Sequence, residues 1–319
     1  MAFKYINPGY ANLLDVYGGT TVEGATYSKT GVSFWQPTKG HGIVLTETPT
    51  ELYGKFDAYL HYESDSDSHD VALTISIGGK NDVKNGVKVF KHYDEWGVCG
   101  LLSSSWVVSK QASIDYPENL KKTTHLKLED VNTFYFHLKL ETGTRKGKIT
   151  LWVNDVQIGT GEREDVDFQG NKILEIASTA RHGLISNIIL SDREIDPREQ
   201  VVMLPSMIAE TTMADSGDGV YTATAAGQIL LQTADTTALA AAYGEESQVT
   251  GIALVGNPAY RTAEGLCALT ALEKNGETVT EYGRHILKGQ PTGAIVDSRA
   301  VAMRLTELAG RKFGWKAGE

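Results

Sequence analysis

The chain has 319 residues, of which 41% are hydrophobic and 22% charged, so a folded protein of two domains is expected. The formal net charge of -10 excludes broad contact with nucleic acid, because phosphate binding relies on Lys and Arg. Two cysteines are too few for a disulfide scaffold. No apolar run reaches the roughly 20 residues that cross a bilayer, and the first residues lack the pattern of a secretory signal, so synthesis in the cytoplasm without membrane insertion is expected.

The composition changes near residue 196. Before this point lie 21 of the 27 aromatic residues but only 8 of the 28 alanines, which indicates two different kinds of core. Asp196-Pro197 marks the change, because proline disfavours both helix and ladder at this position. We therefore predict a first domain over residues 1–195, a second over 196–319 and a linker over about 194–200.

The first region has the pattern of β-strands. Apolar and polar residues alternate with period two over residues 55–62, 71–77 and 133–140. Turn signals such as Asn85-Gly86 separate such runs at hairpin spacing, and no convincing helical period occurs. Many short antiparallel strands with regular turns predict a sandwich or barrel.

The end of this region is the most specific part of the sequence. The run GKITLWVNDVQIG at residues 147–159 predicts a hairpin that turns at Asn154-Asp155, and HGLISNIILSD at 182–192 predicts a closing strand. These runs, with YANLLD at 10–15 and YSKTGVSF at 27–34, resemble the concanavalin-A-like, laminin-G-like jelly roll. The resemblance covers about 190 residues and implies an antiparallel jelly-roll β-sandwich.

The second region mixes strands and helices, so we predict a mainly β protein whose sandwich is followed by a small α+β domain. Short strands are expected at 220–224, 228–232 and 249–255, and a hairpin about Asn275-Gly276. Helices are expected at 235–244, where Gly244 follows the last turn, and at 297–308, where Val301, Leu305 and Leu308 form one stripe.

This alanine-rich region, with FGWK at residues 313–316, resembles a module of phage and prophage tail proteins that have a lectin-like domain in front. The resemblance implies attachment to other virion or tail proteins. It also implies a homo-oligomer with closed symmetry, and the trimer is the symmetry common among tail fibres.

Three tryptophans are candidates for ligand binding, because sugar rings stack on flat aromatic faces. Trp35, Trp96 and Trp106 lie in or beside predicted loops. Burial in the core is the alternative for each, since a sandwich normally buries Trp. Burial is favoured for all three, and Trp96, between Asp94-Glu95 and Gly97, is the first choice for an exposed one.

A run of carboxylates at residues 63–70 is the candidate metal site. Asp65, Asp67 and Asp70 could supply oxygen ligands to calcium from one loop. The spacing does not match an EF-hand, and a solvated hairpin tip explains the same residues.

No catalytic pattern is present, so we expect no enzyme. The stretch GEREDVDFQG at 161–170 is acidic, but it lacks the spacing of a glycanase strand and reads as a loop. The histidines show no metal-protease spacing, no nucleophile elbow occurs, and Gly78-Gly79-Lys80 opens no helix that could cradle a phosphate.

These observations together predict a non-catalytic structural protein of a bacteriophage or phage-tail-like particle. It would be assembled into the virion in the host cytoplasm and would display a lectin-like domain to a cell-surface polysaccharide. One alternative is a glycan-degrading jelly-roll enzyme, which needs two facing carboxylates about 5 to 9.5 Å apart. The other is a capsid decoration protein that binds no sugar.

Overall fold

A computed structural model describes residues 4–7, 20–26, 33–36, 41–44, 49–60, 71–78, 84–141, 143–166, 173–177, 183–256, 268–286 and 295–318. The chain forms two compact units, Met1–Val201 and Val202–Glu319. Within the described ranges, no helix has both the length and the apolar character needed to span a bilayer.

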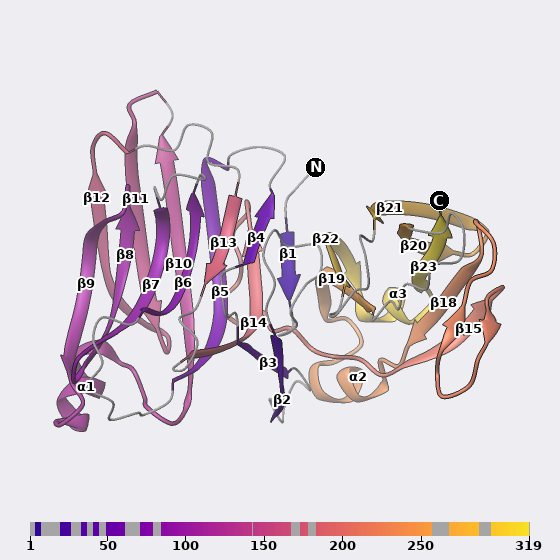
Figure 1. The fold of residues 1–319 in the computed structure, drawn as a ribbon, viewed down its shortest axis with the longest axis horizontal. Helices are drawn as coiled ribbons and strands as arrows, with labels where there is room; N and C mark the ends of the chain where they lie inside the picture. Colours follow the sequence, from indigo (N-terminus) through magenta and orange to yellow (C-terminus); the bar gives the residue numbers. More distant parts are fainter. Residues whose placement is uncertain are drawn as a thin grey trace. The chain divides into compact units, whose positions relative to one another are not determined.

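The first unit contains two antiparallel sheets (Figure 1). The eight-stranded sheet has the order β12-β11-β10-β5-β14-β3-β2, and β1 also pairs with β14. Its strands are β1 (Lys4–Asn7), β2 (Thr20–Thr26), β3 (Ser33–Gln36), β5 (Glu51–Leu60), β10 (Val131–Glu141), β11 (Lys146–Val153), β12 (Val156–Arg163) and β14 (Gly183–Ser191).

The six-stranded sheet has the order β4-β13-β6-β7-β8-β9, so β9 is one of its edges. Its strands are β4 (His41–Val44), β6 (Val71–Gly78), β7 (Lys84–His92), β8 (Glu95–Leu102), β9 (Ser105–Ser113) and β13 (Ile173–Ala177). The only helix described in this unit is α1 (Pro117–Thr124), next to β9 in the chain.

One hydrophobic core joins the two sheets, as a sandwich requires. Phe56, Phe134 and Leu151 from the larger sheet share it with Ile75 and Val98 from the smaller one. The core residues of β10 are every second residue, and those between them are less buried. The predicted alternation is thereby confirmed, and the unit is an antiparallel β-sandwich.

In the first unit the predicted hairpin turn is confirmed, but a helix is present that was not predicted. The predicted hairpin joins β11 to β12, and Asn154 and Asp155 take φ values of 49° and 64°, the left-handed pair of a tight hairpin turn. The expectation of no helix was wrong for α1. Pro117 stands at its start, Leu120 is its buried anchor, and His125 ends it in the left-handed conformation at φ 59°.

The second unit is also built mainly of strands. Its five-stranded sheet has the order β15-β18-β23-β20-β21, and β16-β17 and β19-β22 form separate pairs. Its elements are β15 (Ser206–Thr211), β16 (Ala214–Asp215), β17 (Tyr221–Thr222), β18 (Ile229–Ala234), α2 (Thr237–Tyr243), β19 (Gln248–Gly256), β20 (Ala268–Asn275), β21 (Thr278–Ile286), β22 (Ile295–Arg304), α3 (Leu305–Ala309) and β23 (Lys312–Gly318).

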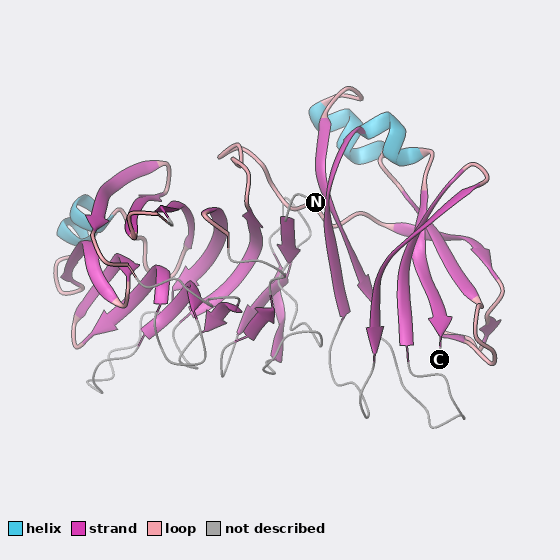
Figure 2. Cartoon of the chain, turned by 90° about the horizontal axis from the view of Figure 1, so that it is seen from above, coloured by secondary structure: helices cyan, strands magenta, loops and turns pink. Residues whose placement is uncertain are grey.

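The two helices lie together on one side of this unit (Figure 2), and both contribute to the cluster around Phe313. The predicted helix ending at Gly244 is confirmed as α2. The helix predicted over 297–308 is wrong for most of its length, because those residues continue β22, which pairs with β19. Only the short α3 remains of it.

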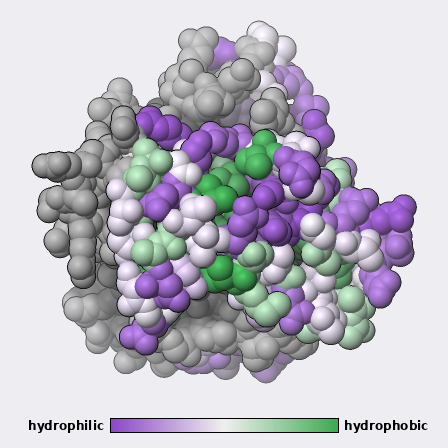
Figure 3. Space-filling model, turned by 90° about the vertical axis from the view of Figure 1, so that its right-hand side faces the viewer, coloured by the Kyte–Doolittle hydropathy of each residue, from purple (hydrophilic) through white to green (hydrophobic). Residues whose placement is uncertain are grey.

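The surface of the second unit is mixed in polarity. Met207, Val279 and Ile286 are all more than half exposed. Figure 3 shows one side of the unit, where small green apolar groups are separated by purple polar ones. The described residues on that side therefore form no single broad apolar patch.

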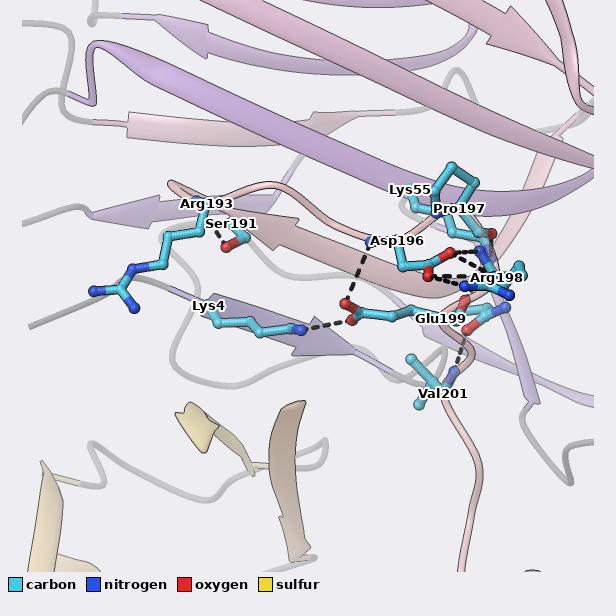
Figure 4. A network of polar contacts seen from close by, with 10 residues as sticks. Lys4, Lys55, Ser191, Arg193, Asp196, Pro197, Arg198, Glu199 and Val201 are labelled. Carbon is cyan, nitrogen blue, oxygen red and sulfur yellow. Dashed lines mark hydrogen bonds and ion pairs between the residues drawn. The ribbon is translucent and has the colours of Figure 1, made fainter. Parts of the chain in front are cut away.

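The last residues of the first unit are tied to its larger sheet (Figure 4). Lys4 Nζ contacts Glu199 Oε2 at 2.6 Å, and Lys55 Nζ donates to the backbone carbonyl of Glu199. The Val201 N–H donates to Asn187 Oδ1 at 2.7 Å. Because these partners come from three strands of the sheet, the segment that follows β14 belongs structurally to the first unit.

This attachment explains where the units divide. The composition changes near residue 196, but the structural boundary follows Val201. Residues 194–200, predicted as a linker, are held against the larger sheet, because Lys4 and Lys55 both bind Glu199.

Candidate functional site

The three tryptophans predicted as ligand-binding residues have different environments. Trp106 on β9 is 49% exposed. Trp96 on β8 is 0% exposed within the sandwich core, so the choice of Trp96 as the exposed one was wrong. Trp96 stands on the same side of β8 as the core residue Val98, and its side chain therefore points between the sheets. The backbone of Trp35 pairs with Ile185, but its side chain is not described.

The predicted calcium ligands cannot be placed in the same way. Asp65, Asp67 and Asp70 lie outside the described residues, so calcium binding there stays a prediction. Elsewhere, in the parts of the chain that the structure describes, no three His, Cys, Asp or Glu side chains gather as a metal ion would require.

Trp106 belongs to a cluster on the outer face of the six-stranded sheet. Val87 and Val89 of β7 point into the core, so the residues that alternate with them point outward. The outward side chains of β7, β8 and β9 meet there, and we call this cluster the Trp106 face. Its members are Lys88, Phe90, Cys99, Leu101 and Trp106.

The Trp106 ring covers a small apolar floor. Its centroid lies 4.6 Å from that of Phe90, with 38° between the planes, and Phe90 is only 3% exposed. Phe90 is buried together with Cys99 and Leu101 in a cluster separate from the sandwich core. The indole is thus supported from below while about half of it remains open to solvent.

Gly97 makes room for this floor. It pairs with Phe90 across β7 and β8. A Cβ atom at Gly97 would lie 2.4 Å from Phe90 Cζ and 2.8 Å from the backbone oxygen of Lys110. Because any larger residue would collide with the ring, the glycine determines where Phe90, and therefore Trp106, can lie.

Polar groups border the indole. Ser109 and Gln111 follow Trp106 on the same face of β9, opposite Cys99 and Gly97, and both are exposed. Lys88 Nζ lies 5.4 Å from the centroid of the Trp106 ring, within the range of a cation–π contact. An open aromatic ring with a cation, a hydroxyl and an amide beside it can stack against an apolar ring face and bond its substituents.

Cys99 shows how well the floor is shielded. Burial raises the pKa of its thiol to about 12, although Lys88 favours the thiolate. A thiol with that pKa is neutral at physiological pH and therefore has no nucleophilic role. Cys99 is therefore a small buried apolar group, while Cys267 lies outside the described residues.

The outer face of the larger sheet has a second aromatic group, formed by Tyr53 and His137. The rings of Tyr53 and His137 stack with centroids 4.2 Å apart, and both side chains contact Glu51 Oε1, at 3.0 and 2.7 Å. Burial raises the pKa of Glu51, but the hydrogen bonds of His137 and Tyr53 outweigh it, and the pKa is lowered. A general acid for glycoside hydrolysis needs a raised pKa, so Glu51 suits accepting hydrogen bonds rather than donating a proton.

Two glutamates of the acidic stretch considered for catalysis are paired with lysines. Glu162 lies 2.7 Å from Lys148, and Glu164 lies 2.9 Å from Lys146. The hydrogen bond and charge of Lys148 lower the pKa of Glu162. Both carboxylates form ion pairs on the exposed surface beside β11 and β12, as a structural role predicts.

Comparison with known proteins gives a likeness in fold only. No family model matches the chain, and no curated protein matches its sequence. Solved structures that resemble it include peanut lectin with a nine-residue peptide (TM-score 0.35, 12% identity, 60% of this chain and 97% of that chain). The carbohydrate-binding module CBM66 from Bacillus subtilis has a TM-score of 0.33 and 11% identity, over 58% of this chain and 96% of that chain. Sheep galectin-11 with glycerol has a TM-score of 0.30 and 12% identity, over 49% of this chain and 97% of that chain.

Proposed function

We propose that this protein binds a saccharide on the Trp106 face and performs no chemistry on it. The observation that supports the proposal is the half-exposed indole of Trp106, held against the buried Phe90. Pyranose rings have an apolar face of C–H groups and a rim of hydroxyls. The apolar face can stack on the indole, and the hydroxyls can form hydrogen bonds with Ser109, Gln111 and Lys88.

The first test is Trp106→Ala in a multivalent form of the full chain on an array of cell-wall and capsular saccharides. About half of the Trp106 side chain, which has an area of roughly 250 Å², is exposed. A sugar that covers half of this exposed area buries about 60 Å² and gains about 1.5 kcal/mol at about 25 cal/mol per Å². We expect Trp106→Ala to weaken binding about tenfold per site.

The matched control is Trp152→Ala, which removes the same side chain from the outer face of the other sheet, where Trp152 packs against Tyr135. Trp152→Ala should leave saccharide binding within twofold of the unmodified chain. No binding to any saccharide by the unmodified chain, or equal losses in the two variants, would refute the proposal.

A second measurement addresses catalysis. The bound saccharide is incubated with the protein, and new reducing ends are counted. We expect none, because hydrogen bonds from His137 and Tyr53 lower the pKa of Glu51, whereas a general acid needs a raised pKa. Release of reducing ends that is abolished by Glu51→Gln would favour the hydrolase instead.

The setting that we propose is a phage or phage-tail-like particle, to which the second unit attaches the chain together with other virion proteins. The support is the sequence resemblance of the alanine-rich second region to tail modules. Many copies on one particle would convert weak single sites into strong attachment. Electron microscopy with antibody against this chain tests the setting, and label absent from particles would refute it.

A further inference from the structure

A hollow beside α1 is lined by cations that have no acidic partner among the described residues. It has a volume of about 440 Å³ and lies among α1, β9 and β12. Its lining is Lys110, Asn119, Lys122, Thr123, His125, Gln157 and Ile158. Ligand pockets in proteins typically hold about 300–1,000 Å³, so the hollow is large enough for a disaccharide.

The cations come from two different elements, so the chain fold brings them together. Lys110 lies on the edge strand β9, and Lys122 lies in the last turn of α1. The His125 backbone is fixed on both sides, because its N–H donates to the Lys121 carbonyl and its own carbonyl accepts from Asn154 Nδ2 at 2.7 Å. A lysine at the end of a helix is favoured by the helix dipole, but that effect does not account for Lys110.

The second hollow on this unit provides a contrast. It is lined by Lys139, Lys146 and Lys148 together with three glutamates. There Lys146 and Lys148 are each in an ion pair, with Glu164 and Glu162. Among the described residues, no ion pair involves Lys110 or Lys122, and no carboxylate lines their hollow. In a chain of net charge -10, this leaves a local positive site open to an anion.

We propose that this hollow binds an acidic saccharide, a sugar unit with carboxylate or sulfate groups. Lys110 and Lys122 would bond the anionic groups, while the amides of Asn119 and Gln157 and the Thr123 hydroxyl suit sugar hydroxyls. No described Trp, Tyr or Phe lines the hollow, so its described lining offers no stacking surface of the kind on which nucleobases bind. The site is independent of the proposed Trp106 site, because Lys110 pairs with the core-facing Val98 and so points away from the face of β9 that bears Trp106.

The test is calorimetric titration of the full chain with five probes. These are a sulfated heparin-derived disaccharide, a galacturonate disaccharide, the neutral disaccharide cellobiose, inorganic sulfate and AMP. We expect saturable binding of one or both acidic disaccharides, weaker binding of sulfate and none of cellobiose. Affinity should fall as NaCl is raised, because exposed charges are screened.

Lys122→Gln should weaken binding of the acidic disaccharide about five- to tenfold, since it removes one charge-assisted contact. Lys121→Gln is the matched control. It removes the same charge from the neighbouring position on α1, which does not line the hollow, and should change affinity less than about twofold. Thermal melting of both variants checks that folding is intact.

Equal losses in the two lysine variants would show only diffuse attraction and would overturn the proposal. So would AMP binding as tightly as the acidic disaccharides, or the absence of saturable binding by either disaccharide. Trp106→Ala should leave this binding unchanged. The failure of one site is therefore distinguishable from the failure of the other.

Discussion

Gly97→Ala tests the packing that holds Trp106 in place. The added methyl group would lie 2.4 Å from Phe90 Cζ, against an ordinary contact distance of about 3.4 to 4 Å. The ring would have to move by about 1 Å or leave the cluster. The backbone oxygen of Lys110, at 2.8 Å, and the Gln111 Cβ, at 2.9 Å, prevent the methyl group from moving to the other side.

Either response has a calculable cost. Overpacking that keeps Phe90 in place costs about 1–3 kcal/mol. Expelling the ring would expose about half of a side chain of roughly 200 Å², which at about 25 cal/mol per Å² costs about 2.5 kcal/mol. Because the chain takes the cheaper route, we expect a loss of about 2 kcal/mol. For a unit of about 200 residues this lowers the melting temperature by about 4–8 °C.

Differential scanning calorimetry of the full chain is the assay, because it can separate the transitions of the two units. Gly143→Ala is the matched control: its Cβ would have no neighbour within 4 Å, and the change should be neutral or slightly stabilising. Saccharide binding should weaken in Gly97→Ala because Trp106 loses its support. A Gly97→Ala variant that melts within 1 °C of the control would refute the packing of Phe90 over Gly97.

Two further predictions concern buried titrating groups. Because burial raises the pKa of Cys99 to about 12, its alkylation by iodoacetamide at pH 8, followed by peptide mass spectrometry, should be about a thousandfold slower than that of a free thiol; a rate near that of glutathione would contradict it. Burial also raises the pKa of Asp57 above its unfolded value of 3.8, although Asn187 and Thr133 bond the carboxylate. The stability that this carboxyl contributes is therefore fully present below pH 3.8 and is lost as pH rises through the raised value. Asp57→Asn removes this dependence, so urea unfolding should give a stability difference between variant and parent that increases in favour of the variant from pH 3 to 7; a constant difference would refute the assignment.

The strands of the first unit were predictable because their pattern is local. In β10 the residues from Asn132 to Leu140 alternate strictly between buried and less buried positions, as the sequence of that strand already indicates. The β11–β12 hairpin was predictable for a similar reason, since Asn154 and Asp155 tolerate positive φ. Features that depend on period two or on turn chemistry therefore follow from the sequence alone.

The segment 297–308 shows where local pattern fails. Val301, Leu305 and Leu308 recur at helical spacing, yet Val301 lies in a strand that pairs with β19 over almost its whole length. Short apolar runs fit either period, and pairing with a distant strand decides between them. Similarly, α1 has only one buried apolar residue, Leu120, so its sequence shows no helical period from which the helix could be predicted.

The sequence also did not show that Trp96 is buried and Trp106 is exposed, again because strand pairing decides this. In the sequence EWGVCGLL around Trp96, Gly97 stands where an alternating strand would have a polar residue and Gly100 where it would have an apolar one, so its two faces cannot be told apart by period. Trp96 lies two residues before the core residue Val98 and therefore points inward. Trp106 pairs with the outward-facing Leu101, and the register of β8 and β9 shifts between this pair and the pair of Gly100 with Val108. That irregularity changes which residues of β9 face outward. Because β9 is also an edge, none of the described strands pairs with its outer side, and an open indole results from pairing that one sequence alone does not reveal.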